Sequence, residues 1–138
     1  MYDIAISYTR KGKKEAKYAK EVAKILKNYG LKVFFDEFEV DKLWGRENFE
    51  ELYDIFANRA KYVVAFISKN YMENEYTFHE LKAIKTKVIK TKDKYTPVLI
   101  INFDNQKIKG LTDIYGYLDG NKFSPKEIAT KILKKNEQ

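Results

Sequence analysis

The stretch Lys61-Tyr62-Val63-Val64-Ala65-Phe66-Ile67-Ser68 is apolar almost without interruption. A short continuous run of this kind, rich in Val, Ile and Phe, is typical of a strand buried on both faces, as in a parallel sheet. Similar runs occur at residues 2–8, 31–36 and 96–103. A weaker fifth run, Ile114-Tyr115-Gly116-Tyr117-Leu118, has an interior glycine and is better suited to a sheet edge.

Segments with helical spacing of apolar residues separate these runs. Their apolar positions are Ala16, Ala19, Ala23 and Leu26, then Phe49, Leu52, Tyr53 and Phe56, then Leu81, Ile84 and Val88, and finally Ile128, Ile132 and Leu133. The last segment follows Ser124-Pro125-Lys126-Glu127, which predicts a capping box. Strands that alternate with helices predict an α/β fold, a flavodoxin-like doubly wound five-stranded parallel sheet of order 2-1-3-4-5. We expect residues 1–138 to form a single domain, since the length suits one core.

Composition narrows the function classes. The chain has no cysteine and one histidine, so we expect no metal site. No apolar run reaches membrane-spanning length and the chain begins without a signal-like segment, so we expect a cytoplasmic location and no membrane partner. The net charge of +7 is spread over helices that also carry acidic residues, as in Lys17-Tyr18-Ala19-Lys20-Glu21, and this disfavours a nucleic-acid partner.

The expected topology places a ligand crevice at the carboxyl ends of the first and third strands. Two loops meet there, Ser7-Tyr8-Thr9-Arg10-Lys11-Gly12 and the segment from Ser68 to Glu80. Neither a dinucleotide-binding glycine motif nor a P-loop is present. The acidic residues of a phospho-receiver domain are also missing, because Ser7-Tyr8 and Ser68 stand in their places.

Three stretches resemble the TIR (Toll/interleukin-1 receptor/resistance) domain family, and in particular its bacterial NAD-cleaving members. The opening Tyr2-Asp3-Ile4-Ala5-Ile6-Ser7-Tyr8 is similar to the first box of the family. Gly30-Leu31-Lys32-Val33-Phe34-Phe35-Asp36 resembles its second strand, and Glu37 to Glu47, with Leu43-Trp44-Gly45, takes the place of its BB loop. Tyr76-Thr77-Phe78-His79-Glu80 resembles the aromatic-x-x-x-Glu signature of the NAD⁺-cleaving enzymes.

The resemblance implies that Glu80 is the catalytic carboxylate, which contacts the nicotinamide ribose and stabilises an oxocarbenium-like transition state. Tyr76, where many members have Trp, would flank that ribose from the same helix face. Further residues implied to bind the substrate are Ser7, Tyr8, Arg10, Asp36, Trp44 and Gly45. NAD⁺ is expected as substrate, and no cofactor is expected.

Several of these residues also have ordinary structural interpretations. Thr77-Phe78-His79-Glu80 fits a capping box in which the glutamate serves only a helix start. Asp36 could brace the long loop, Trp44 could anchor it, and Arg10 could be a plain surface cation. His79 adjoins Glu80 but points elsewhere on a helix, which favours a surface or partly packed histidine.

The sequence therefore predicts an NAD⁺ glycohydrolase or cyclase that releases nicotinamide and forms ADP-ribose or a cyclic isomer. By resemblance to the TIR component of Thoeris antiphage defence, the product would be a signal for a separate effector protein. The first alternative is a non-catalytic TIR module that self-associates through its BB loop and helices. The second is an enzyme similar to nucleoside deoxyribosyltransferases, against which the TIR-like stretches argue.

Overall fold

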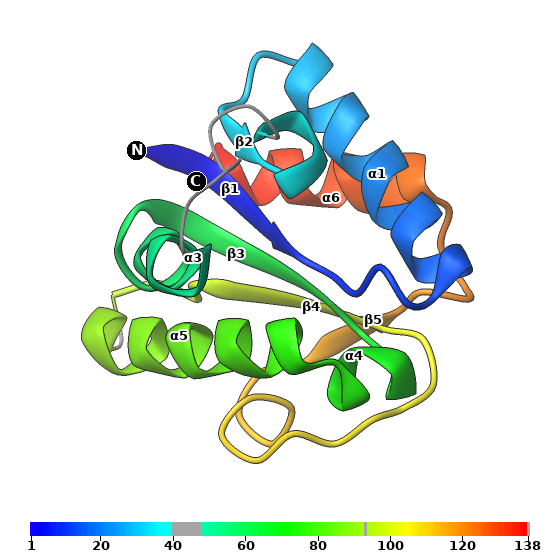
Figure 1. Cartoon of the computed structure of the whole chain (residues 1–138). Helices are drawn as coiled ribbons and strands as arrows, with labels where there is room; N and C mark the ends of the chain where they lie inside the picture. The colour runs from blue at the N-terminus through cyan, green and yellow to red at the C-terminus, as the bar shows by residue number, and fades with distance from the viewer. Residues whose placement is uncertain (40–47, 93, 138) are drawn as a thin grey trace.

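The computed structural model describes residues 1–39, 48–92 and 94–137. Its elements alternate along the chain as expected for an α/β fold (Figure 1). The strands are β1 (Tyr2–Ser7), β2 (Val33–Phe34), β3 (Ala60–Ile67), β4 (Val98–Asn102) and β5 (Tyr117–Asp119). The helices are α1 (Lys13–Asn28), the 3-10 helix η1 (Asp36–Glu39), α3 (Asn48–Asn58), α4 (Lys69–Glu73), α5 (Glu75–Thr91) and α6 (Pro125–Asn136).

All five strands pair in parallel in the order β2-β1-β3-β4-β5, which confirms the predicted topology. β3 lies at the centre, and its side chains alternate between two apolar clusters. Val63, Ala65 and Ile67 pack on the α3 and α5 side, while Val64 and Phe66 face α1 and α6. Figure 1 shows α1 and α6 on one side of the sheet and α3, α4 and α5 on the other. Both faces are therefore covered, which explains why β3 is apolar apart from Lys61 near its start.

Two strand predictions need correction. The second strand was expected over 31–36, but β2 holds only Val33 and Phe34, and Asp36 begins η1. The fifth was expected over 114–118, but β5 begins at Tyr117. The N–H groups of Ile114 and Tyr115 donate to the carbonyl of Leu111, so a turn occupies the first half of that run. Apolar composition alone could not separate this turn from the strand.

Side-chain caps set the starts of α5 and α6. The predicted capping box of α6 is present, since the Ser124 hydroxyl accepts from the Glu127 N–H and the Glu127 carboxylate accepts from the Ser124 N–H. By contrast, α5 begins two residues before Thr77, and Asn74 is its N-cap, with Oδ1 accepting from the Tyr76 N–H. Glu80 therefore lies in the second turn of α5 and is not a capping residue. This leaves its carboxylate free for another role.

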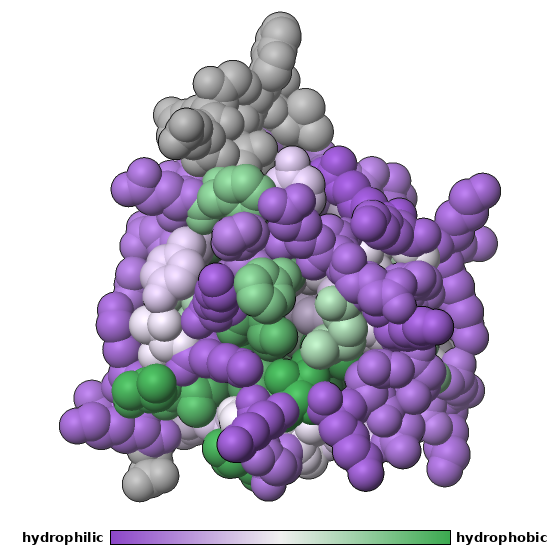
Figure 2. Space-filling view, turned by 60° about the horizontal axis from the view of Figure 1, so that its bottom comes forward, coloured by the Kyte–Doolittle hydropathy of each residue, from purple (hydrophilic) through white to green (hydrophobic). Residues whose placement is uncertain are grey.

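The surface is largely hydrophilic, as the high content of charged residues requires. Figure 2 shows one such face, on which polar side chains surround a smaller area of exposed apolar atoms. Among the described residues, no helix is long and apolar enough to cross a bilayer.

Candidate active site

The carboxyl ends of β1 and β3 meet α4 and the first turns of α5 at one edge of the sheet (Figure 1). Asn74 connects the loop that follows β1 to the start of α5. Its side-chain amide donates to the Thr9 hydroxyl at 2.9 Å, while its Oδ1 caps α5. The start of α5 is thereby fixed against the loop that follows β1, and α5 carries Glu80 into the same edge.

Glu80 is only 8% exposed, and its carboxylate accepts a hydrogen bond from Ser7 at the end of β1. The Ser7 Oγ to Glu80 Oε1 distance is 2.7 Å. On its other side, Ser7 Oγ lies 2.7 Å from the hydroxyl of Tyr71, which comes from α4. Side chains from β1, α4 and α5 therefore form one chain of hydrogen bonds that ends at the Glu80 carboxylate.

Burial gives this carboxylate unusual acid-base chemistry. Loss of hydration raises the pKa of Glu80 to about 8, because the charged form is disfavoured in an apolar environment. The Ser7 hydrogen bond and the positive charge of Arg10 lower that pKa, while the negative charge of Asp36 raises it. A buried carboxylate with a strongly perturbed pKa at the carboxyl ends of parallel strands is typical of a functional group.

A second cluster lies beside the first. The Tyr8 hydroxyl donates to Asp36 Oδ1 at 2.6 Å, and Arg10 pairs with Asp36 Oδ2 at 3.0 Å. Burial and the bond to Asp36 raise the pKa of Tyr8 above its ordinary value, so the ring keeps its proton. Asp36 thus braces two residues of the first loop, while the Arg10 side chain remains 64% exposed and within reach of a ligand.

Tyr76 does not share the burial of Glu80, although the two residues are one helical turn apart. Its ring is 54% exposed and stacks on Phe49 of α3, with ring centroids 5.1 Å apart. Phe49 also contacts His79, whose ring centroid lies 4.4 Å away. His79 is half-buried in this contact, in agreement with the interpretation as a partly packed histidine. The aromatic group of the signature therefore forms part of the rim of the site.

The structure thus places Ser7, Tyr8, Arg10, Asp36, Tyr76 and Glu80 at one edge of the sheet. Trp44 and Gly45 lie outside the described residues. Sequence reasoning missed Tyr71, Asn74 and Phe49. Tyr71 and Asn74 lie in the loop that it selected, but no local pattern separates them from their neighbours. Phe49 was expected on the buried face of its helix and is instead exposed against Tyr76.

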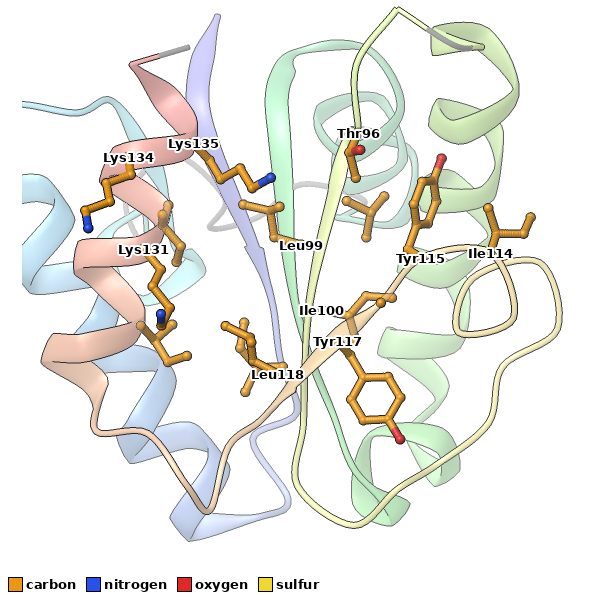
Figure 3. A pocket seen from close by; sticks show the side chains of 15 residues that line it. Thr96, Leu99, Ile100, Ile114, Tyr115, Tyr117, Leu118, Lys131, Lys134 and Lys135 are labelled. Carbon is orange, nitrogen blue, oxygen red and sulfur yellow. The ribbon is translucent and has the colours of Figure 1, made fainter.

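A cavity of about 720 Å³ lies elsewhere, between β4, β5 and α6 (Figure 3). Its walls are mostly apolar, and Lys131, Lys134 and Lys135 of α6 line one side. None of the lining residues in the described part of the chain is a carboxylate. The described lining therefore offers no carboxylate to stabilise a developing positive charge, in contrast to the position of Glu80. In the described ranges, no group of three or more His, Cys, Asp or Glu side chains is arranged to hold a metal ion.

Comparison with known proteins agrees with this geometry. The model of the TIR domain family matches residues 4–133, which is nearly the whole chain. The chain belongs to the TIR domain family. A curated relative, the 3' cyclic ADP-D-ribose synthase AaTIR of Aquimarina amphilecti, is 35% identical to it over 139 residues. That match covers 99% of this TIR domain but only 41% of the relative, so the chain spans less than half of the relative's length.

A solved structure supports the fold of the TIR domain independently. The TIR domain of the Toll-related receptor TRR-2 from Hydra magnipapillata superposes with a TM-score of 0.71 over the whole of both chains. The two sequences are 13% identical, so this likeness concerns the fold alone.

Proposed function

We propose that this TIR domain is an NAD⁺ glycohydrolase or cyclase with Glu80 as its catalytic residue. The observation that carries the proposal is the Glu80 carboxylate, buried at the carboxyl ends of β1 and β3 and held by Ser7. The 35% identity to a 3' cyclic ADP-D-ribose synthase supports NAD⁺ as the substrate class. Membership of the TIR family also favours this activity over that of a deoxyribosyltransferase.

In the proposed reaction the bond between the ribose anomeric carbon and the nicotinamide nitrogen breaks. Nicotinamide leaves with the bonding electron pair, and positive charge develops on the ribose. A nearby carboxylate in a low-dielectric site stabilises that charge strongly. Water then attacks the anomeric carbon to form ADP-ribose, or a nucleophile of the same molecule attacks it to form a cyclic isomer. In both cases the attacking group loses a proton to solvent.

The raised pKa of Glu80 fits a cationic substrate. The nicotinamide ring of NAD⁺ is positively charged, and a positive charge near a carboxyl group favours its ionised form. Binding of NAD⁺ would therefore lower the pKa of Glu80 from about 8 and generate the carboxylate in the complex. Arg10 would receive the pyrophosphate, and Tyr76 would flank the ribose or the departing nicotinamide.

The proposed enzyme would produce a signalling molecule and would self-associate. A diffusible cyclic product would act on a separate effector protein in bacterial antiphage defence, in the cytoplasm where NAD⁺ is present. Residues 1–138 would act as one TIR domain, and copies would associate through TIR surfaces that include the BB loop. Trp44 and Gly45 of that loop would cover or complete the site.

The decisive experiment compares wild type with Glu80→Gln and Glu80→Ala. Each protein is incubated with NAD⁺ and, separately, with deoxynucleosides, and products are resolved by chromatography at increasing protein concentration. We expect nicotinamide release by wild type only, with a loss of at least a hundredfold in both variants. Intact NAD⁺ with concentration-dependent self-association would support the non-catalytic alternative. Equal turnover in all three proteins would show that another group performs the chemistry.

A further inference from the structure

Tyr71 is a buried tyrosine whose hydroxyl contacts Ser7, the residue that binds Glu80. The residue is 1% exposed, yet its hydroxyl points to Ser7 Oγ at the edge of the sheet and lies 2.7 Å from it. Its backbone already serves α4 and α5, because its N–H donates to Ser68 and its carbonyl accepts from the Thr77 hydroxyl. These backbone bonds hold the junction of α4 and α5, and the hydroxyl makes a separate contact with Ser7.

The direction of the hydrogen bonds follows from a count of protons. Ser7 has one hydroxyl proton, and when Glu80 is ionised the geometry directs this proton to Glu80 Oε1. The proton between Ser7 and Tyr71 must then come from Tyr71. Burial and the charge of Glu80 raise the pKa of Tyr71, so this phenol stays protonated and remains a donor. Two hydroxyl groups in series therefore point toward one carboxylate, and each bond polarises the next.

We propose that Tyr71 is a positioning residue for Glu80, acting through Ser7. In this arrangement Ser7 and Tyr71 fix the orientation of the carboxylate and provide donors to its charged form. Ser7 would thus act on Glu80 rather than contact NAD⁺ itself, since it is fully buried. The inference rests on the proposed function of Glu80, but it can be measured without turnover.

Other groups also influence this carboxylate and must be held constant. Asp36 of η1 and Arg10 of the first loop act on Glu80 with opposite charges, and Tyr8 is tied to both. Substitution of Tyr71 leaves all three in place. Removal of its hydroxyl weakens the donor that Ser7 presents, so the charged form of Glu80 loses stabilisation and the pKa of Glu80 rises.

The test is a direct titration of Glu80 by carbon-detected NMR in protein with labelled glutamate side chains. Wild type, Tyr71→Phe and Ser7→Ala are compared, and Glu80→Gln assigns the resonance. Tyr18→Phe is the matched control, since Tyr18 is also buried and donates its hydroxyl proton, but to the carbonyl of Phe123. Thermal unfolding of each protein checks that the variants fold.

We expect the midpoint of Glu80 to move to higher pH in Tyr71→Phe, further in Ser7→Ala, and not in Tyr18→Phe. A midpoint shift of one unit means about tenfold less carboxylate at pH values well below it. NAD⁺ cleavage by Tyr71→Phe should then fall by about three- to tenfold at pH 6.5 and recover above pH 9. A midpoint in Tyr71→Phe equal to that in wild type would overturn the proposal. If the midpoints shift as expected but wild type does not cleave NAD⁺, Tyr71 still positions Glu80 and the proposed function is contradicted.

Discussion

The Ser7 hydroxyl and the Glu80 carboxylate are 73 positions apart in the chain and 2.7 Å apart in space. This contact joins the last residue of β1 to the second turn of α5. The bond favours the charged form of Glu80 and burial favours the neutral form. Burial has the larger effect, since the pKa of Glu80 is raised to about 8.

Glu80→Gln should stabilise the fold at alkaline pH. The folded-state pKa of about 8 lies above the ordinary glutamate value of 4.5, so between these values the folded chain holds a proton that the unfolded chain has lost. Stability of wild type therefore falls as pH rises from about 5 to 8 and stays low above that range. Gln avoids this cost and can still accept from Ser7. We expect the difference in the free energy of unfolding to grow by roughly 4 kcal/mol from pH 5 to pH 9.

Urea unfolding followed by circular dichroism at pH 5, 7 and 9 measures this difference. Glu75→Gln is the control, because Glu75 is an exposed carboxylate in the first turn of the same helix. An effect of Glu80→Gln that is the same at all three pH values would contradict the prediction.

Asp36→Asn should weaken substrate binding more than it slows the chemical step. The substitution removes the ion pair with Arg10 and weakens the bond from Tyr8, so both residues lose their fixed positions. We expect KM for NAD⁺ to rise about five- to tenfold, corresponding to roughly 1 kcal/mol, with a smaller change in kcat. Steady-state kinetics measures both. Asp54→Asn, which breaks a comparable ion pair with Arg59, should leave KM unchanged.

Phe49→Ala should impair turnover without direct loss of a substrate contact. Phe49 stacks on Tyr76 and so restricts the ring that would flank the substrate. Loss of the stack costs roughly 1 kcal/mol, and we expect kcat/KM for NAD⁺ to fall about fivefold. Phe78→Ala is the control, because Phe78 is exposed like Phe49 but lies on α5, and its ring contacts Lys82 and His79. Equal losses in the two variants would point to general disturbance of α5.

Gly12→Ala should destabilise the loop that follows β1. A Cβ at this position would lie 2.1 Å from Glu15 Oε2 and would displace that buried carboxylate. Glu15 would then lose the hydrogen bonds from Ser68 and Asn70. We expect a loss of roughly 1–3 kcal/mol in the free energy of unfolding, measured in urea. Gly116→Ala, where a Cβ meets open space, should be close to neutral; a loss as large as that of Gly12→Ala would show that the Glu15 contact is not the cause.

Much of the architecture follows from the sequence alone. The continuous apolar run of β3 requires cover on both faces, and the alternation of strands and helices then leads to a doubly wound parallel sheet. The same topology brings the carboxyl ends of β1 and β3 together, so the segment from Ser68 to Glu80 could be selected before any contact was known. The capping box at Ser124 was likewise readable, because all its partners lie within four residues.

Only the tertiary structure decided how the site is made. Thr77-x-x-Glu80 matches a capping box locally, yet Asn74 caps α5, and Glu80 meets Ser7 instead. The pairing of Asp36 with Tyr8 and Arg10 was equally unreadable. The reason is physical: periodicity and capping depend on neighbours within a few residues, whereas the partner and pKa of a buried polar group depend on which distant segments packing brings to it. The sequence determined that Glu80 lies beside the carboxyl ends of β1 and β3, and the fold determined that it is a buried, hydrogen-bonded carboxylate with a raised pKa.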